Sequence, residues 1–435
     1  MLIGKLLCIS PAQSFSLEVD DIAADKSISH RCAMFSLLTD KPSVIKNYLL
    51  AEDTLHTLEI AKTLGLEVEE IDSHTMRFTP PKKIKEPNCI LDCGNAGTGM
   101  RLYAGLLSGV EGFFVLSGDK YLCARPMNRI IQPLQSIGAR IHSRAGGFAP
   151  MAIIGSQLDG FNYQSPISSA QVKSAMILAA LHAKDKSTYI ENESSRDHTE
   201  KMLIGMGAEI KKHENTIHIS PLTKPLESMD FAIPADPSSA FFFALAAAIV
   251  PGSEILLKNV VLNKTRIQAF EILKQMGAKV TFTKTSSPYE EVGDIYVAYA
   301  PLHGITIDSH ISWLIDELPA LGIAMAVANG KSEVKNAKEL RVKETDRIHA
   351  LLVNLRALGV ECEEREDGYV IYGGTLKTSA KPASIQSFGD HRIAMSFAIA
   401  GLVSAVEISD YACISISFPN FDAILCRIQS VKYIV

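Results

Sequence analysis

The sequence predicts an α/β protein with two lobes, built from six repeats of an α/β unit (three per domain), with helices inside and sheets outside. Three observations support this prediction. A phrase containing glycine recurs five times, and a polar residue opens an apolar helix six times at nearly the same interval. The length of 435 residues is also too great for one ordinary hydrophobic core.

The recurring phrase marks the end of a helix and the start of a strand. It occurs as AKTLGLEV, LQSIGARI, LIGMGAEI, LKQMGAKV and LRALGVEC, with successive glycines 69 to 82 residues apart, at Gly65, Gly138, Gly207, Gly277 and Gly359. Each copy combines an amphipathic helix with the residue that most favours a helix C-terminus. Before Gly359, for example, apolar residues fall on one helical face at Ile348, Leu351, Leu352, Leu355 and Leu358.

The second periodic feature is a polar or charged residue at or near the start of an apolar helix. These residues are 69 to 78 positions apart, at Ser27, Thr98, Ser169, Ser238, Asp316 and Asp390. Both periods indicate six units of about 70 residues, and we expect the chain to end inside the last one. If the helix starts meet, their backbone N–H groups and helix dipoles form anion sites.

The composition favours a soluble globular protein over a membrane, secreted or nucleic-acid-binding one. Hydrophobic content of 47% and charged content of 21% are those of a soluble globular chain. The net charge of −5 gives no reason to expect nucleic acid, and the longest apolar run, 240–250, is too short to span a membrane. The first ten residues lack the pattern of a signal peptide, and the eight cysteines are scattered without the usual zinc spacing. We therefore expect a cytoplasmic protein with reduced thiols and no metal.

Cations accompany the helix starts. They lie in the segments DKSISHR, NAGTGMR, LCARPM, SSAQVKSA, RVKETDR and GDHR, which contribute Lys26, Arg31, Arg101, Arg125, Lys173, Arg341, Lys343, Arg347, His391 and Arg392. Each alone is compatible with a solvated charge or an ion pair, and each polar helix start with a simple N-cap. Together they favour a site for several anionic groups, because arginine matches carboxylate and phosphate geometry.

The segments DKSISHR, GNAGTGMR, SGD…ARPM, SSAQVKSA, IDELPAL, RVKETDR and FGDHRIAM resemble, in order, the signature segments of the enolpyruvylshikimate-phosphate synthases. The matches span residues 25 to about 395, nearly the whole chain. The resemblance implies transfer of the enolpyruvyl group of phosphoenolpyruvate to the 5-hydroxyl of shikimate 3-phosphate, with release of phosphate. This chemistry implies no cofactor, metal, nucleic acid or membrane. It also implies a glyphosate target in aromatic amino acid biosynthesis, and we expect a monomer.

The resemblance also implies roles for individual residues. Contacts to shikimate 3-phosphate fall on Lys26, Ser27, Arg31, Ser168, Ser169, Ser195, Asp316 and Lys343. Contacts to phosphoenolpyruvate fall on Lys26, Gly97, Arg125, Arg347 and Arg392, with Gln171 between the two ligands. The same helix-opening segments add candidate binding residues at Asn95, Thr98, Arg101 and His391. The proton-transfer candidates are Asp316, Glu344 and Lys26, and which of them moves each proton is left open.

The resemblance predicts domain boundaries too. Residues 23–233 form the N-terminal lobe, and residues 234–435 form the C-terminal lobe, which residues 1–22 rejoin. The chain departs from some family members at Glu339, at the SRDH segment of 195–198, and at Ile416 and Ser417, where a lysine can precede the Phe-Pro pair. Two other functions are considered: a UDP-N-acetylglucosamine enolpyruvyl transferase, for which Cys123 lies too close to Arg125, and a non-catalytic anion-binding homologue.

Overall fold

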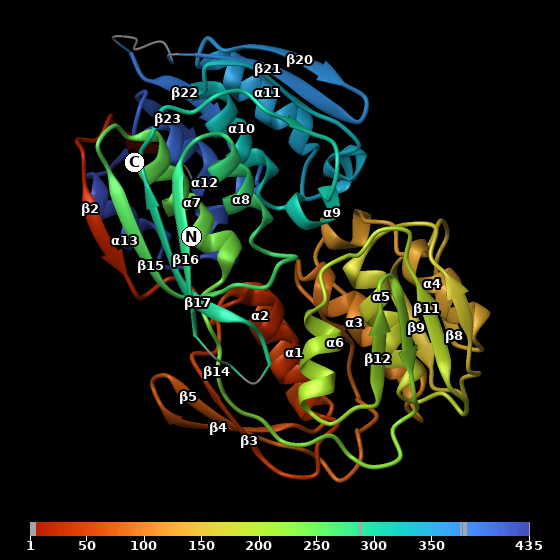
Figure 1. Ribbon diagram of the computed structural model, residues 1–435. Coiled ribbons are helices and arrows are strands. Elements are labelled where there is room, and N and C mark those ends of the chain that lie inside the picture. The colour runs from red at the N-terminus through yellow and green to blue at the C-terminus, as the bar shows by residue number, and fades with distance from the viewer. Residues whose placement is uncertain (1–5, 286, 288, 375, 377–380, 435) are drawn as a thin grey trace. The chain divides into compact units, whose positions relative to one another are not determined.

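A computed structural model describes residues 6–285, 287, 289–374, 376 and 381–434. The chain divides into two compact units (Figure 1). The N-terminal unit contains residues 24–233 and 288–290, and the C-terminal unit contains residues 1–23, 234–287 and 291–435. The last residue of the short insertion, Glu290, is buried in the N-terminal unit, where its Oε1 lies 2.5 Å from Nδ1 of His198.

The described residues form six four-stranded sheets that share one topology. In each sheet the first two strands in spatial order are parallel, and the next two pairings are antiparallel. The N-terminal unit contains the sheets β14 (Asp230–Ala232), β3 (Ser43–Lys46), β5 (Thr75–Thr79), β4 (Glu67–Asp72); β6 (Leu91–Asp92), β7 (Phe113–Ser117), β9 (Phe148–Ile154), β8 (Arg140–Arg144); and β10 (Asn162–Gln164), β11 (Ser187–Ile190), β13 (Thr216–Ile219), β12 (Ile210–His213). The C-terminal unit contains β2 (Ser16–Val19), β15 (Glu254–Val261), β17 (Val292–Ala298), β16 (Lys279–Thr285); β18 (Thr306–Ile307), β19 (Gly330–Val334), β21 (Gly368–Gly373), β20 (Glu361–Arg365); and β22 (Ala383–Gln386), β23 (Val406–Ser409), β1 (Leu6–Ile9), β24 (Lys432–Ile434).

Two helices accompany each sheet, and they differ in burial. The inner helices are buried on nearly all sides and are α1 (Lys26–Ser36), α3 (Gly97–Ser108), α5 (Ala170–Ala180), α7 (Pro237–Ile249), α10 (Leu318–Val327) and α12 (His391–Ala400). The outer helices are half-exposed and are α2 (Glu52–Thr63), α4 (Asn128–Ser136), α6 (His198–Gly205), α8 (Gln268–Gln275), α11 (Arg347–Ala357) and α13 (Phe421–Ile428). Short turns occur at η1 (Leu122–Ala124), α9 (Ile311–Leu314), η2 (Lys338–Val342) and η3 (Tyr411–Ile416). The expected fold class, with six repeats and inner helices, is therefore confirmed.

The inner helices of each unit pack on one another. In the N-terminal unit α3 lies against α5 and α1, and in the C-terminal unit α7, α10 and α12 contact each other in pairs (Figure 1). All thirteen residues of α7 are buried, among them Phe241, Phe242 and Phe243. A helix that is apolar all round is stable only inside a core, so these helices leave mainly their ends available for binding.

The recurring glycines have the predicted conformation. Each glycine directly follows the C-cap residue of an outer helix. The backbone angle φ is positive at all five, from 77° at Gly359 to 118° at Gly277. Glycine lacks the Cβ that makes this left-handed region unfavourable for other residues, so the helix can end and the chain can enter the next strand.

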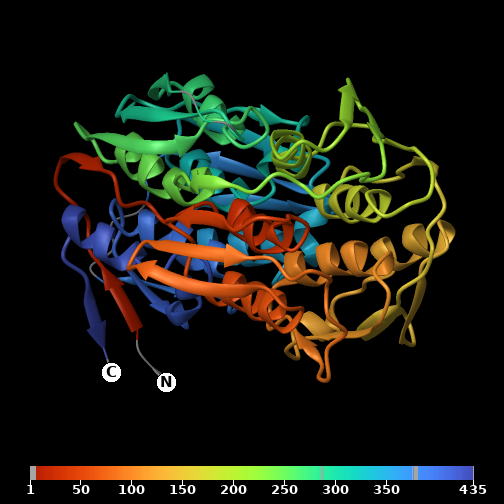
Figure 2. The ribbon, with the colours of Figure 1, turned by 90° about the horizontal axis from the view of Figure 1, so that it is seen from below.

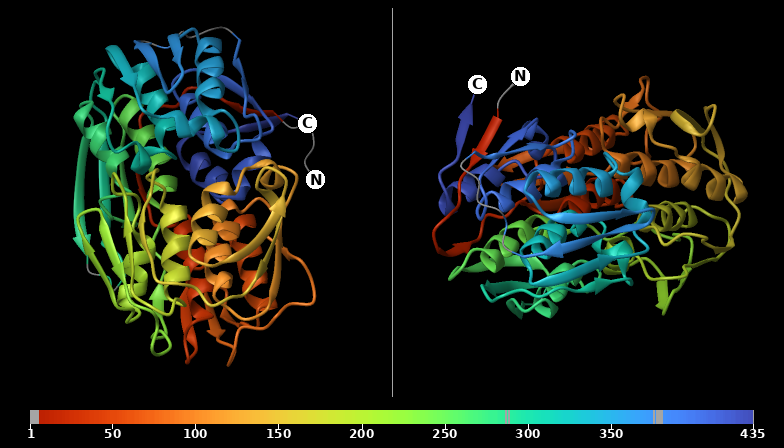
Figure 3. Two further views of the ribbon diagram at one scale, coloured as in Figure 1. Left: turned by 90° about the vertical axis from the view of Figure 1, so that its right-hand side faces the viewer. Right: turned by 90° about the horizontal axis from the view of Figure 1, so that it is seen from above.

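In three of the sheets, one strand comes from a part of the sequence outside the repeat that supplies the other three strands. In two of these sheets it is the first strand, and in the third it is a later one. β14 completes the sheet of β3 although the whole N-terminal unit separates them in sequence, and β2 pairs in parallel with β15. In the last repeat β1 lies between β23 and β24, so the first described strand supplies what the last repeat lacks. Figures 2 and 3 show β1 beside β24.

The N-termini of the inner helices differ in whether a side chain caps them. Asp25, Asp236 and Asp390 are N-caps of α1, α7 and α12, and each carboxylate accepts a backbone N–H of the first turn at 2.8 Å. By contrast, α3 and α5 begin after Ala96 and Ser169, and neither has a side-chain cap. The N–H of Gly97 donates to the carbonyl of Asn95 at 2.8 Å, so it is the other first-turn N–H groups of α3 and α5 that suit an added acceptor. Among the described residues, no helix has the length and apolarity needed to cross a membrane.

Candidate active site

The predicted site residues fall into two groups, one in each unit. We call the group around the open ends of α3 and α5 the Gln171 cluster; its members are Lys26, Ser27, Arg31, Asn95, Gly97, Thr98, Arg101, Arg125, Ser168, Ser169, Gln171 and Ser195. We call the group in the C-terminal unit the Arg347 cluster; its members are Asp316, Lys343, Glu344, Arg347, His391 and Arg392.

Gln171, in the first turn of α5, joins the two uncapped helices. Its Oε1 accepts a hydrogen bond from Nη1 of Arg101 at 2.9 Å, and its Nε2 donates to Oγ1 of Thr98 at 3.0 Å. Arg101 is buried and also donates to the carbonyl of Gly97 at 3.3 Å. The amide thus fixes a guanidinium beside two helix N-termini, which is an arrangement that favours an anion.

Gly97 makes room for two guanidinium groups. A Cβ at this position would lie 2.7 Å from Nη1 of Arg101 and 3.2 Å from Nη1 of Arg125. Asp119 fixes the turn that carries Arg125, because its Oδ1 accepts the N–H of Leu122 at 2.7 Å. Asn95 donates to the other oxygen of Asp119 at 2.9 Å, so it positions this turn. Asp119 was not predicted as a functional residue, although it belongs to the SGD segment.

Two of the predicted binding residues in α1, Lys26 and Arg31, have partners inside the protein. Lys26 forms an ion pair with Asp53. Arg31 is buried and donates to Oγ1 of Thr199 at 2.8 Å, to Oγ of Ser174 at 3.0 Å and to the carbonyl of its own helix at Ser27 at 2.9 Å. Its guanidinium therefore ties α1 to α5 and α6, and a contact with a substrate phosphate would have to share these bonds.

The three predicted serines differ in what their hydroxyls do. Ser169 is the N-cap residue of α5, but its side chain makes no capping bond. Oγ of Ser168 accepts the backbone N–H of Glu193 at 3.1 Å, so its own hydrogen is not used by that bond. The hydroxyl of Ser195 donates to Oε2 of Glu191 at 2.7 Å, and Ser195 is buried.

Two of the cations near helix starts have internal partners. Lys173 is fully buried, and its ammonium lies 2.8 Å from Oε1 of Glu191 and 2.9 Å from Oε1 of Glu200. Arg341 forms ion pairs with Asp346 at 2.7 Å and Glu364 at 2.9 Å, and it also donates to two carbonyls of the β20–β21 turn. Internal carboxylates thus hold both cations, and we do not assign either of them to a substrate.

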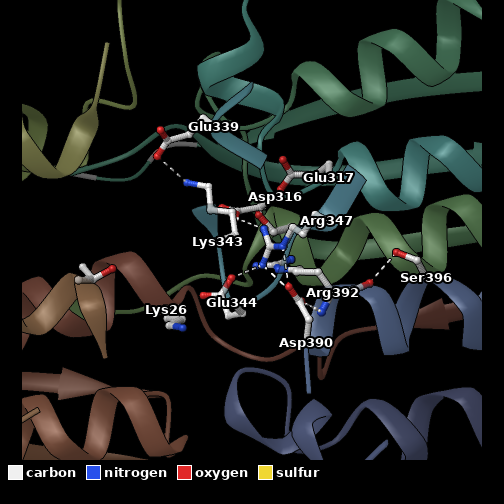
Figure 4. A network of polar contacts seen from close by, with 12 residues as sticks. Lys26, Asp316, Glu317, Glu339, Lys343, Glu344, Arg347, Asp390, Arg392 and Ser396 are labelled. Carbon is white, nitrogen blue, oxygen red and sulfur yellow. Dashed lines mark hydrogen bonds and ion pairs between the residues drawn. The ribbon is translucent and has the colours of Figure 1, made fainter. Parts of the chain in front are cut away.

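Arg347 is the centre of the second cluster, and three carboxylates surround it (Figure 4). Its Nε lies 2.8 Å from Asp390, its Nη2 lies 2.6 Å from Glu344, and its Nη1 lies 3.4 Å from Asp316. Burial acts to lower the pKa of Arg347, but the charge of Asp390, followed by those of Glu344 and Asp316, raises it above the ordinary value. Burial raises the pKa of Asp390, although Arg347 opposes this shift.

Lys343 lies at the edge of the same cluster (Figure 4). Its Nζ lies 3.2 Å from Oε1 of Glu339, the residue at which the sequence departs from some family members. Burial lowers the pKa of Lys343, while the charges of Glu339 and Asp316 oppose that shift. A lysine with a lowered pKa gives up its proton more readily than an exposed one, which is useful in acid–base chemistry.

Arg392 differs from Arg347 in lacking such partners. It lies in the first turn of α12 and is buried, with its guanidinium over the ring of Phe242 at 5.8 Å. Within the described part of the chain, neither Nε nor Nη1 of Arg392 has a hydrogen-bond partner. A buried cation with unsatisfied donors is costly, so its presence indicates an anionic ligand at this position. The neighbouring His391 is also buried at the start of α12.

Each cluster contains cations that suit anionic groups, and the Arg347 cluster also contains carboxylates that suit proton transfer. Arg101, Arg125 and Arg392 can hold carboxylate or phosphate groups, while Asp316 and Glu344 provide carboxylates beside Arg347. No group of three or more His, Cys, Asp or Glu side chains in the described ranges is arranged to hold a metal ion. Arg196 is the only basic residue in the ENESSRD segment that leads into α6.

Comparisons with known proteins point to one family. The model of the family described as EPSP synthase (3-phosphoshikimate 1-carboxyvinyltransferase) matches residues 9–425. The chain is 58% identical over 430 residues to the 3-phosphoshikimate 1-carboxyvinyltransferase of a Nitratiruptor species, covering 98% of each chain. It is 59% identical to the enzyme of that name from Wolinella succinogenes, covering 96% of each chain.

Solved structures agree with this result. The 2.37 Å structure of EPSP synthase from Acinetobacter baumannii matches with a TM-score of 0.87 at 36% identity, over 99% of this chain and all of the other. The enolpyruvyl transferase NikO from Streptomyces tendae matches with a TM-score of 0.78 over 99% of each chain. At 14% identity that second likeness concerns the fold alone.

The unsatisfied donors of Arg392 predict that a simple anion stabilises the protein. Phosphate at several times its dissociation constant should raise the unfolding temperature of the wild-type protein by a few degrees, because a ligand that binds only the folded state stabilises it. Arg392→Met should lose most of this increase. The measurement is thermal unfolding in phosphate and in sodium chloride of equal ionic strength, with Arg356→Met, on the outer helix α11, as the matched control. An equal phosphate response in both variants would contradict the assignment.

Proposed function

We infer that this chain, which belongs to the EPSP synthase family, is a 3-phosphoshikimate 1-carboxyvinyltransferase. It is a transferase of the shikimate pathway and of aromatic amino acid biosynthesis, and its substrates are phosphoenolpyruvate and shikimate 3-phosphate. The structural observation that best supports this function is the buried guanidinium of Arg392, of which two nitrogens have no hydrogen-bond partner among the described residues. It lies in the same cluster as two carboxylates held by Arg347. An anion held there would lie near groups that can move protons.

We assign the phosphoenolpyruvate contacts to the guanidinium groups of three arginines and to the space at Gly97. Arg347 and Arg392 carry two of these groups, and Arg125 approaches Gly97. Lys26 adds an ammonium, and Gln171 orients Arg101 through a 2.9 Å hydrogen bond. Arginine suits this role because its fork of N–H donors matches both the carboxylate and the phosphate of the substrate.

We assign the 3-phosphate of the second substrate to the open end of α5. Ser169 has no capping bond there, and the hydrogen of Ser168 is not used by its bond to Glu193, so both hydroxyls are suited to donate to a phosphate. We add Arg196, whose segment is tied to this helix start through the same Glu193 bond. Asp316 and Lys343 are assigned to the hydroxyls of the shikimate ring.

The reaction needs proton transfer in both directions. When the 5-hydroxyl adds to carbon 2 of phosphoenolpyruvate, the hydroxyl loses its proton and the methylene carbon gains one, which gives a tetrahedral intermediate. Loss of a methyl proton together with the phosphate group then restores the double bond. Asp316 and Glu344 are the carboxylates available for these transfers in the Arg347 cluster, and Lys26 is a further candidate. Fixed arginines stabilise the phosphate as it leaves.

Three further features are part of the proposal. The eight cysteines are free thiols, which supports a cytoplasmic location. We propose that the protein acts as a monomer, which sedimentation measurements would test. We also propose that residues 23–233 form one domain and that residues 1–22 and 234–435 form the other. The division of the chain into two compact units, with boundaries between residues 23 and 24 and between residues 233 and 234, supports this proposal.

The direct test of the function is an assay of phosphate release with two acceptors. We expect release from phosphoenolpyruvate when shikimate 3-phosphate is present, and none above background with UDP-N-acetylglucosamine. Prior treatment with a chelator should leave the rate unchanged, because the proposed proton transfers use no metal. Turnover only with the sugar nucleotide, or with neither acceptor, would refute the proposed function.

The positions of Asp316 and Glu344 on Arg347 predict large effects on turnover. Asp316→Asn or Glu344→Gln should lower kcat by about 10²–10⁴, because each change removes a group that can exchange a proton with the substrates. Circular dichroism and thermal unfolding should show that both variants remain folded, since both side chains are partly exposed. A kcat near that of the wild-type enzyme in either variant would remove that residue from the acid–base mechanism.

The space at Gly97 predicts sensitivity to glyphosate, in competition with phosphoenolpyruvate. Glyphosate is also an anion with a carboxylate and a phosphorus oxyanion, but it is longer. A Cβ at position 97 would meet only the ends of the Arg101 and Leu122 side chains and of Arg125, so Gly97→Ala should fold. It should raise the inhibition constant about 5- to 150-fold, the equivalent of about 1–3 kcal/mol for a methyl group in a packed site.

The KM for phosphoenolpyruvate should rise less in the same variant, because the substrate is shorter. Steady-state kinetics of the wild-type and Gly97→Ala enzymes, with both ligands, provide the comparison. An equal rise in both constants would show that Gly97 serves the backbone and the two arginines, and not the extra length of the inhibitor. A wild-type enzyme insensitive to glyphosate would contradict the prediction as a whole.

A further inference from the structure

Ser195 is held by a buried group of charges at every polar atom it has. Its N–H donates to Oε1 of Glu191 at 3.0 Å, and its hydroxyl donates to Oε2 of the same carboxylate at 2.7 Å. Its carbonyl accepts a hydrogen bond from the ammonium of Lys173 at 3.1 Å. Since a serine hydroxyl has one hydrogen, and an ionised carboxylate can only accept, Ser195 has no hydrogen left for a substrate phosphate.

The charged side chains that hold Ser195 are almost completely buried. The side chains of Lys173 and Glu191 are 0% exposed, and that of Glu200 is 2% exposed. The ammonium of Lys173 donates to Oε1 of Glu191 at 2.8 Å and to the carbonyl of Ser195 at 3.1 Å, and it forms an ion pair with Oε1 of Glu200 at 2.9 Å. Burial acts to lower the pKa of Lys173, but the charges of Glu200 and Glu191 raise it above the ordinary value, which keeps the cation charged. Buried ions in such geometry bind strongly to each other, and removing one leaves the others costly.

The three charged residues come from three different elements around one loop. Lys173 lies in the inner helix α5, Glu191 directly follows β11, and Glu200 lies in the first turn of α6. The loop between β11 and α6 carries Ser195 and Arg196, and its Glu193 N–H donates to Oγ of Ser168 at 3.1 Å. The buried group therefore joins this loop to the helix start assigned to the substrate phosphate.

We propose that Glu191, held by Lys173, is a positioning residue for the 3-phosphate of shikimate 3-phosphate, and that Ser195 acts through Glu191 and not as a direct phosphate donor. Glu191 fixes the loop before the substrate arrives, so that Ser168 and Arg196 stand at the open end of α5. This inference rests on the proposed function. It adds a residue, Glu191, that holds the phosphate-binding loop in place and that the sequence alone did not indicate.

The first test is a cycle of Glu191→Gln and Ser195→Ala. Glutamine keeps the size of the side chain but has an amide in place of the second oxygen, so it cannot accept the N–H and the hydroxyl together. We expect Glu191→Gln to raise the KM for shikimate 3-phosphate about tenfold or more, while kcat and the KM for phosphoenolpyruvate change less than about threefold. The double variant should resemble Glu191→Gln within about twofold, because both changes break the same link.

Glu209→Gln, an exposed glutamate in the same unit, is the matched control and should leave all three constants unchanged. A KM for shikimate 3-phosphate in Glu191→Gln within threefold of the wild-type value would overturn the proposal. So would a double variant whose increase is the product of the two single increases, because Ser195 would then contact the phosphate independently.

The second test uses the wild-type enzyme, so it does not depend on whether a variant folds. Hydrogen–deuterium exchange should show the Ser195 amide protected about 100-fold or more without ligand, because Glu191 already accepts its N–H. Adding shikimate 3-phosphate should increase this protection by less than tenfold. Protection that appears only with the ligand would overturn the proposal. Failure of the proposed function would instead appear as absent turnover in the wild-type enzyme, with the protection of Ser195 intact.

Discussion

The complete burial of one helix in each repeat is the constraint on which the arrangement of this protein depends. An inner helix such as α7 has apolar residues on all sides, and all thirteen of its residues are buried. Such a helix cannot present a functional side chain from its middle without placing a charge in the core. On the inner helices, binding groups are consequently expected near the N-terminus and in the loop before it, where the backbone N–H groups and the helix dipole also favour anions.

The inner helices differ in whether a side chain accepts the backbone N–H groups of the first turn. Asp25, Asp236 and Asp390 supply carboxylate caps, and each accepts one backbone N–H of the first turn. The uncapped starts of α3 and α5 lie beside Arg101 and the serines of the Gln171 cluster. A carboxylate therefore caps α1, α7 and α12, whereas no side chain caps α3 or α5.

Charge pairing explains which buried ions are structural. Lys173 is held by Glu191 and Glu200, since a buried ion without a partner is strongly destabilising. Arg392 is the contrasting case, with two nitrogens that have no partner within the described ranges. The cost of this state is small only if an anion binds there, so the position is specialised for binding at the expense of the stability of the free protein.

The sequence by itself determined the repeat, its period and its helix ends, because these depend on local chemistry. Glycine at Gly65 or Gly359 ends a helix through its own backbone freedom, and the fold class followed from counting such positions. The helix-opening motifs likewise identified Arg347, Gln171 and Gly97, because these residues lie within one or two turns of a recognisable helix start.

Only the tertiary structure decided which strands complete each sheet and which cations are free to bind. β1 pairs with β24 across nearly the whole chain, and no local pattern encodes such a pairing. Lys173 follows the same kind of helix start as Arg101, yet it is held by Glu191 and Glu200, which lie 18 and 27 residues further along the chain. On a helix buried on all sides, hydrophobic periodicity cannot indicate where a side chain points. The partner of a charge is set by packing between elements, so Ser195 and Lys173 became structural while Arg392 remained available for a ligand.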